Sequence, residues 1–197
     1  MKVIFLDNDG VLCLYKDHGS RFNKQDKLYG NGERPDHNEI EILTRFDNLD
    51  KKCVEVFNEI LEKSGAEYVV SSDWRKYATL DELGFYYLSQ GVNKRPIGFT
   101  DFFDYEIWSK SDLIPEGTFF PREAYEKERY FEITKWLNEH PEVTHWVAID
   151  DMNLAKKFRL YSGETERSWG FENFVRTDEV EGIKRSGTKE KIIKFLK

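Results

Sequence analysis

Cysteine is scarce in this chain, and its scarcity excludes one class of protein at once. The 197 residues include two cysteines, Cys13 and Cys53, which are too few for a disulfide framework. Their spacing matches no metal-binding motif. Cys53 falls in a predicted helix and is expected to be a small buried apolar residue. The chain is therefore not a small secreted protein held together by disulfides.

Long hydrophobic runs, a signal peptide and an excess of positive charge are also lacking. No apolar run approaches the roughly 20 residues that span a bilayer, and no signal peptide precedes the first predicted strand. We therefore expect a cytoplasmic protein with no membrane partner. The formal net charge of −7 argues against an extended nucleic-acid-binding surface, but it allows a local basic pocket for one phosphate.

No repeat, low-complexity tract or Pro/Gly/Ser-rich linker divides the chain, so we expect a single domain over residues 1–197. The 15 Phe, 10 Tyr and 5 Trp residues and the 39% hydrophobic content suffice for a packed core. The stretch at about 13–46 is polar and rich in turn residues. It predicts a small loop-rich insertion, within which a short helix and a hairpin are both compatible with the sequence.

The hydrophobic patterns predict strands that alternate with helices. We expect strands at 3–6, 67–70, 144–149 and 171–176, and helices at about 51–63, 80–90, 122–140 and 189–196. Asp50 and Thr188 are the expected N-caps of the first and last of these helices, and residues 91–122 are expected to be irregular. This order predicts an α/β fold, a Rossmann-like, mainly parallel sheet with helices on both faces. Ligands bind such sheets outside the carboxyl ends of the strands.

Polar residues follow three of the predicted strands directly. They are Asp7, Asp9, Ser71, Ser72, Asp150 and Asp151. Side chains alternate along an extended segment, so Asp7 and Asp9 are expected to point the same way. Crowded carboxylates repel one another unless a proton or a cation lies between them, and Mg²⁺ prefers such oxygen ligands. Read alone, Asp7-Asn-Asp-Gly10 is also compatible with an ordinary turn.

In their order and spacing, these motifs resemble the haloacid dehalogenase (HAD) superfamily of phosphoryl-transfer enzymes. The matching stretches are a strand followed by Asp-x-Asp-Gly at 3–11, a strand ending in Ser at 68–71, and a strand ending in an acidic pair at 147–151. The closest likeness is to the HAD domains associated with RNA-repair proteins, akin to polynucleotide 3′-phosphatases. It rests on residues 5–12, 69–75, 132–137, 148–151 and 174–178, with Gly182. The resemblance implies a HAD-like fold, here with a minimal cap or none.

The resemblance also implies a mechanism that uses the acidic residues. Asp7 would be the nucleophile and would form an aspartyl-phosphate. Asp9 would be the general acid and then the base that activates water. Mg²⁺ would be held by Asp7, the backbone carbonyl of Asp9, and Asp150. Asp151 would bind the metal through water or orient Asp150, and its alternative role is that of a helix N-cap.

Three residues after the second strand are expected to meet the substrate phosphate. By the resemblance, Ser71 would bind a non-bridging phosphate oxygen, with Ser72 as the second choice. Arg75 would steer the phosphate or pair with an aspartate, unless it is a solvated surface charge.

The basic residue of the family's third motif has two candidates. Arg129 lies near the start of the helix that leads to the third strand, and its planar guanidinium matches phosphate oxygens. Lys127 is the rival. Tyr130 stands where relatives usually have glycine, which leaves the start of the helix open.

The spacing of the tryptophans and histidines assigns none of them to the site. We expect Trp74, Trp136 and Trp146 to pack in the core. Trp108 and Trp169 are expected in irregular stretches, where contact with substrate is left open. None of the four histidines shows metal-ligand spacing.

These features predict a Mg²⁺-dependent phosphomonoester hydrolase of a phosphorylated small molecule or a nucleic-acid phosphate end. The first alternative is a phospho-acceptor signalling module, but the position of its phosphorylated aspartate is taken by Ser71. The second is a non-catalytic HAD-like module that binds a phosphorylated ligand or partner. The oligomeric state is left open.

Overall fold

The structure is a computed structural model that describes residues 1–30, 35–36, 39–102, 121–155, 158–162 and 165–197. Trp108 and most of the segment expected to be irregular at 91–122 lie outside these residues. Within the described residues, no helix combines the length and the apolar character needed to cross a membrane.

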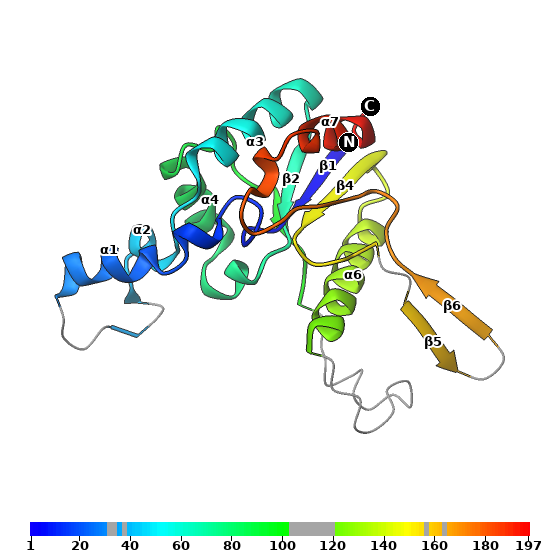
Figure 1. The fold of residues 1–197 in the computed structure, drawn as a ribbon, viewed down its shortest axis with the longest axis horizontal. Coiled ribbons are helices and arrows are strands. Elements are labelled where there is room, and N and C mark those ends of the chain that lie inside the picture. The colour runs from blue at the N-terminus through cyan, green and yellow to red at the C-terminus, as the bar shows by residue number, and fades with distance from the viewer. Residues whose placement is uncertain (31–34, 37–38, 103–120, 156–157, 163–164) are drawn as a thin grey trace.

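A five-stranded parallel sheet forms the centre of the molecule, in the order β3-β2-β1-β4-β7 (Figure 1). Its strands are β1 (Lys2–Leu6), β2 (Glu67–Val70), β3 (Gly98–Phe99), β4 (His145–Asp150) and β7 (Phe174–Arg176). Leu6 is in register with Val70 of β2 and Ile149 of β4, so these three strands end at the same edge. The predicted Rossmann-like α/β sheet is confirmed.

Helices cover both faces of the sheet, as expected (Figure 1). They are α3 (Lys51–Ser64), α4 (Leu80–Ser89) and α7 (Thr188–Phe195) on one face and α6 (Pro121–Glu139) on the other. Successive side chains of β1 alternate between the two cores. Ile4 and Leu6 belong to the larger core, beneath α3, α4 and α7. Val3 and Phe5 belong to the smaller one, beneath α6.

The predicted helix boundaries agree with the structure except at one cap. The Asp50 carboxylate accepts a hydrogen bond from the Cys53 N–H at 3.0 Å, and Gly65 ends α3 with φ of 66°. Thr188 was expected to cap the last helix, and this is wrong. Gly187, with φ of 82°, occupies the N-cap, and Thr188 is the first helical residue. Helix α6 runs through Tyr130 without a break.

The insertion at 13–46 is more helical than expected. It contains a 3₁₀ turn η1 (Tyr15–Asp17), α1 (Ser20–Tyr29) and α2 (Ile42–Arg45). Buried Asp47 accepts hydrogen bonds from the Arg21 N–H at 2.8 Å and the Ser20 hydroxyl at 3.4 Å, which fixes the first turn of α1. Of the two alternatives left open for this segment, the short helix is present among its described residues.

A second sheet, which is an antiparallel hairpin, lies between β4 and β7 in the sequence and was not predicted. It consists of β5 (Phe158–Ser162) and β6 (Thr165–Trp169). The hairpin extends away from the sheet at the right of Figure 1. Trp169 belongs to β6, so its expected place in an irregular stretch is wrong. The last strand of the main sheet begins at Phe174, three residues later than expected.

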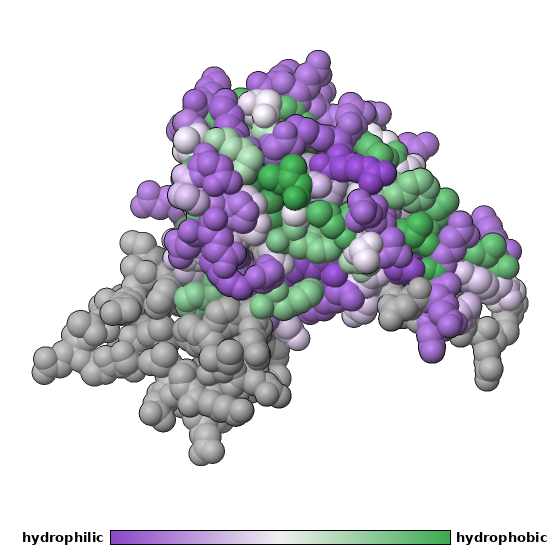
Figure 2. Space-filling view, turned by 180° about the vertical axis from the view of Figure 1, so that it is seen from behind, coloured by the Kyte–Doolittle hydropathy of each residue, from purple (hydrophilic) through white to green (hydrophobic). Residues whose placement is uncertain are grey.

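The tryptophans expected in the core do pack there. Trp74 and Trp136 are buried, and Trp146 makes an edge-to-face contact with Phe5 at 5.9 Å between ring centroids. Both cysteines are free and buried. The residues coloured by hydropathy in Figure 2 are mostly hydrophilic, with smaller hydrophobic patches between them, which agrees with the charged content of 34%.

Candidate active site

Strands β1 and β4 bring three carboxylates together where they end. The Asp7 N–H donates to the Ile149 carbonyl at 3.0 Å, which extends the strand pairing one residue beyond β1. Carboxylate oxygens of Asp7, Asp150 and Asp151 all lie within 4.8 Å of one another. Successive strands of the sheet are added first on one side of β1 and then on the other. The cluster therefore lies at the switch point where open α/β sheets bind ligands.

One buried guanidinium from α6 joins two of these carboxylates. The Nη1 atom of Arg129 donates to Asp7 Oδ1 and to Asp150 Oδ2, both at 3.2 Å. Lys127 lies two residues earlier on α6, and two residues correspond to about 200° around a helix. Of the two basic candidates, Arg129 is the one that the fold directs at the acidic cluster.

The electrostatics of this cluster favour a bound cation. Burial raises the pKa of Asp7 well above its usual value, and the neighbouring Asp150 raises it further, while Arg129 opposes both effects. Burial likewise raises the pKa of Asp150 to about 6, against the lowering effect of Arg129. One guanidinium balances only one of three carboxylates. An oxygen-rich donor set with this excess of negative charge fits a hard divalent cation such as Mg²⁺.

Asp9 lies beside this cluster and has its own partners. The indole Nε1–H of Trp74 donates to Asp9 Oδ2 at 3.0 Å, and His18 Nε2 lies 3.8 Å from Oδ1. Partial burial raises the pKa of Asp9, and His18 and Trp74 oppose that rise. Its side chain remains 48% exposed, so the carboxyl group faces solvent. Oxygen, sulfur and nitrogen atoms of Asp9, Cys13 and His18 also form a group within 4.8 Å.

The turn after Asp9 depends on Gly10. Its φ of 70° lies in the left-handed region that glycine adopts readily. A Cβ atom placed on Gly10 would lie 2.6 Å from the Cβ of Asp151. Glycine therefore permits both the turn and the close approach of the second acidic loop.

The two serines after β2 have different surroundings. The Ser71 N–H donates to the Leu6 carbonyl at 2.8 Å, which aligns this loop with the end of β1. The Ser71 hydroxyl is buried and accepts a hydrogen bond from the Thr100 hydroxyl at 3.3 Å. The Ser72 hydroxyl accepts from the Trp74 N–H at 3.4 Å and caps the 3₁₀ turn η3 (Asp73–Tyr77).

Arg75 is buried, so the alternative reading of a solvated surface charge is wrong. Its Nη2 lies 2.5 Å from Glu132 Oε2, and its Nη1 donates to the Ser72 carbonyl at 2.8 Å. Among the described residues, Arg75 therefore pairs with Glu132 of α6, where pairing with an aspartate was expected. Glu132 also lies 3.5 Å from the Nε atom of Arg129. Glu132 therefore connects the serine loop with the guanidinium that holds Asp7.

Sequence reasoning missed three of these contact residues. Trp74 was assigned to the core, and its ring does stack on Phe46, but its N–H reaches Asp9. His18 lies in the insertion, where no spacing rule relates it to Asp9. Glu132 belongs to a stretch that supported the resemblance, and its distance of three residues from Arg129 on one helix is a signal for their contact.

Comparison with known proteins identifies the family of the chain. No curated protein and no solved structure matches the chain significantly. The family model described as the HAD domain in Swiss Army Knife RNA repair proteins matches residues 3–187, from β1 to the residue before α7. The match includes every residue of the acidic cluster, the serine loop and α6. The chain therefore belongs to the family of HAD domains found in Swiss Army Knife RNA repair proteins.

Proposed function

We propose that this chain is a Mg²⁺-dependent phosphomonoester hydrolase that acts on a nucleic-acid phosphate end through an aspartyl-phosphate. The observation that carries the proposal is the contact of Arg129 with Asp7 and Asp150 at the switch point of the sheet. A carboxylate that can act as nucleophile, a fixed guanidinium and further carboxylates for a metal are the parts that phosphoryl transfer through an aspartyl-phosphate uses.

Asp7 is the proposed nucleophile, and Arg129 prepares it for attack. The guanidinium donates to Oδ1 of Asp7, which fixes the direction of the carboxylate. The same positive charge offsets the repulsion between this carboxylate and an incoming phosphate. Asp7 would attack phosphorus and hold the phosphoryl group until water releases it.

Asp9 is the proposed acid and base. Its raised pKa favours the protonated form needed to donate a proton to the leaving oxygen. The hydrogen bond from Trp74 fixes one carboxyl oxygen of Asp9. After the leaving group departs, the ionised Asp9 would take a proton from the attacking water.

The proposed metal ligands are Asp7, Asp150, the backbone carbonyl of Asp9, and Asp151 directly or through water. When bound, Mg²⁺ would neutralise charge on the phosphoryl group and on the carboxylates around it. Ser71, with its buried hydroxyl at the end of β2, is proposed to bind a phosphate oxygen. Ser72 and Arg75 are proposed to support that loop.

A nucleic-acid end is the proposed substrate class because relatives of this family are domains of RNA repair proteins. The net charge of −7 favours recognition of one terminal phosphate over binding along a nucleic-acid strand. The alternative is a non-catalytic domain that binds a phosphorylated end. The acidic residues at 7, 9 and 150 argue for catalysis, since binding alone does not require a carboxylate aimed at the phosphate.

Replacement of the nucleophile tests the proposal. We expect the unmodified chain to release phosphate from a 3′- or 5′-phosphorylated oligonucleotide in Mg²⁺, and not in EDTA. Asp7→Asn should lower kcat by at least about 10³-fold, because the covalent route is lost. Phosphate release and circular dichroism measure activity and folding. Asp81→Asn is the matched control, since the Asp81 side chain is 99% exposed on α4.

Two results would contradict the proposed mechanism. Hydrolysis that survives Asp7→Asn would remove Asp7 as the nucleophile. Binding of phosphorylated ends by the unmodified chain, with no release of phosphate under any Mg²⁺ concentration, would favour the non-catalytic alternative.

A further inference from the structure

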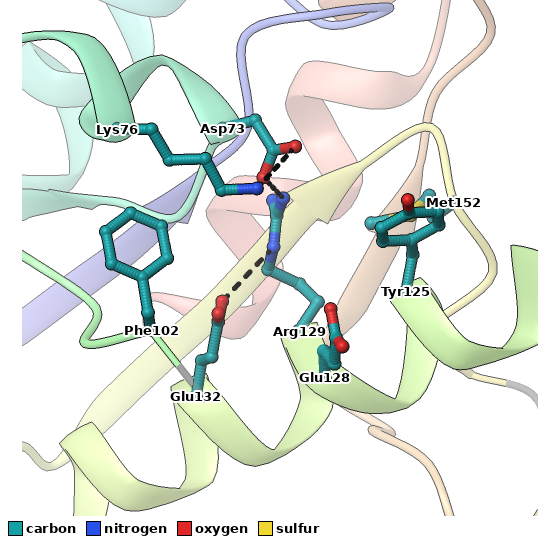
Figure 3. A pocket seen from close by; sticks show the side chains of 8 residues that line it. All are labelled: Asp73, Lys76, Phe102, Tyr125, Glu128, Arg129, Glu132 and Met152. Atoms are coloured by element: carbon teal, nitrogen blue, oxygen red, sulfur yellow. Dashed lines mark ion pairs between the residues drawn. The ribbon is translucent and has the colours of Figure 1, made fainter. Parts of the chain in front are cut away.

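A pocket of about 330 Å³ lies beside the proposed nucleophile, between η3, Phe102 and α6 (Figure 3). It is lined by Asp73, Lys76, Phe102, Tyr125, Glu128, Arg129, Glu132 and Met152. Its volume is at the lower end of the range of about 300–1,000 Å³ that is usual for ligand pockets. A group the size of a nucleoside matches this space.

Arg129 connects the pocket with the acidic cluster. Its Nη1 donates to Asp7 at 3.2 Å, while its Nη2 lies 3.7 Å from Asp73 in the pocket wall. Figure 3 shows Arg129 between Asp73 and Glu132, the two lining residues with which it forms ion pairs there. The pocket and the nucleophile are therefore separated by a single guanidinium. A phosphate at Asp7 would place the group that carries it within reach of the pocket.

Two aromatic rings of the pocket are exposed to solvent. Phe102 and Tyr125 are 49% and 54% exposed, and Figure 3 shows them on opposite sides of the Arg129 guanidinium. The guanidinium carbon of Arg75 lies 4.3 Å from the centre of the Phe102 ring, which steadies that ring against the buried Arg75. Exposed aromatic rings beside a cationic group are the usual means of holding an unpaired nucleobase.

The charges of the pocket argue against a second phosphate there. Its three carboxylates, from Asp73, Glu128 and Glu132, outnumber the two cations, Lys76 and Arg129. Lys76 pairs with Asp73 at 3.0 Å. Within the described residues, no hydrogen bond reaches the half-buried carboxylate of Glu128. Carboxylates accept hydrogen bonds and so favour a neutral ring that carries amino groups.

We infer that this pocket binds the terminal nucleobase of the substrate. The base lies against Phe102 and Tyr125, and its amino group donates to Glu128 or Asp73. Guanine is favoured over uracil, because guanine presents an imino and an amino donor on one edge while uracil presents a single donor between two carbonyl groups. This inference rests on the proposed function, since it assumes that a phosphorylated nucleoside end reaches Asp7.

Binding to a chain that cannot turn over tests the inference. Asp7→Asn would be titrated by calorimetry with guanosine 3′- and 5′-monophosphate, the uridine counterparts, and glycerol phosphate as a probe without a base. We expect one guanosine isomer to bind at least about tenfold more tightly than glycerol phosphate, and more tightly than its uridine counterpart. Adding Phe102→Ala or Tyr125→Ala should reduce the guanosine advantage by about tenfold, the effect of losing one stacking ring.

Phe85→Ala is the matched control, because Phe85 is 47% exposed on α4 and does not line the pocket. It should leave every affinity unchanged. Equal affinities for guanosine monophosphate and glycerol phosphate would overturn the inference, as would equal affinities for guanosine and uridine. A guanosine advantage that survives both aromatic substitutions would also overturn it.

Failure of this inference is distinguishable from failure of the hydrolase proposal. Hydrolysis by the unmodified chain without any preference for a base would overturn the inference alone. Binding that depends on the base and on Phe102, in a chain that never releases phosphate, would support the inference and contradict the hydrolase.

Discussion

Gly10 combines a left-handed backbone conformation with close contact to the acidic residue Asp151. Gly10→Ala places a methyl group in a left-handed conformation and 2.6 Å from the Asp151 Cβ. We expect a loss of about 1–2 kcal/mol of unfolding free energy from the backbone strain, with a further loss from the displaced loop. Mg²⁺ affinity should fall as well, because Asp151 must move. Urea unfolding and Mg²⁺ titration measure the two effects.

Gly65→Ala is a matched control for this substitution. Gly65 has φ of 66°, close to that of Gly10, but a Cβ there meets nothing within 4 Å. Its variant should lose a similar strain energy and keep its Mg²⁺ affinity. If both variants lost Mg²⁺ affinity equally, the contact between Gly10 and Asp151 would not explain the effect.

Some contacts of individual site residues could be predicted from the sequence, and others could not. The clustering of Asp7, Asp150 and Asp151 followed from their places at strand ends, because parallel strands gather their carboxyl ends at one edge. The contact of Trp74 with Asp9 did not follow, since an apolar ring that packs against Phe46 gives no sign of where its single N–H points. The burial of Arg75 did not follow either, because its partner Glu132 lies 57 positions later in the sequence, on α6.

At the scale of single elements, α3 is held at its first turn by the charge of Asp50. Burial favours the neutral form of Asp50, but hydrogen bonds from Lys16, Cys53 and Lys184 outweigh burial and lower its pKa overall. A pKa below that of the unfolded chain, about 3.9, stabilises the folded state above that value. This contribution is lost as the pH falls through the lower, folded pKa.

Asp50→Asn is expected to keep the helix cap and to lose the ion pairs with Lys16 and Lys184. At pH 7 the variant should be less stable by about 1 kcal/mol, because Lys16 is largely exposed and its ion pair is screened. The difference from the unmodified chain should shrink below about pH 4. Urea unfolding between pH 7 and pH 3 measures it. A difference that stays constant with pH would show that the charge of Asp50 does not stabilise α3.

Elements with strong periodicity were predicted well, and elements with weak periodicity were not. Helix α3 has buried residues at helical spacing, a capping aspartate and a terminal glycine, so its bounds agreed within one residue. The sequences of β5 and β6 mix charged and apolar residues without regular alternation, which gives no strand signal. These strands pair with each other and not with the main sheet. Helix α1 has few buried positions and depends on Asp47, outside its own sequence, for its first turn.

At the scale of the whole molecule, metal binding should appear as a change in stability. A ligand that binds only the folded state adds about 2.7 kcal/mol at 100 times its Kd. For a chain of this size we therefore expect Mg²⁺ to raise Tm by about 5–10 °C at that concentration. Asp150→Asn should abolish most of this rise, and EDTA should reverse it in the unmodified chain. Differential scanning fluorimetry measures the shift.

The control for this experiment is Asp81→Asn, which should keep the full Mg²⁺ shift. An equal rise of Tm in Asp150→Asn would mean that Mg²⁺ acts elsewhere, and no rise in the unmodified chain would argue against a magnesium site at the switch point.

The position of α6 has one further consequence. Asp7 and Asp150 lie at the ends of strands of the sheet. The Arg129 guanidinium between them belongs to α6, which packs on the sheet through the smaller of the two cores. Any event that tilts α6 outward would withdraw the guanidinium, and without a bound Mg²⁺ the repulsion between Asp7 and Asp150 would favour protonation of one of them. A protonated Asp7 is no nucleophile. The position of α6 would then control whether Asp7 is ionised and able to react. A ligand that fills the pocket along α6 would favour the reactive position.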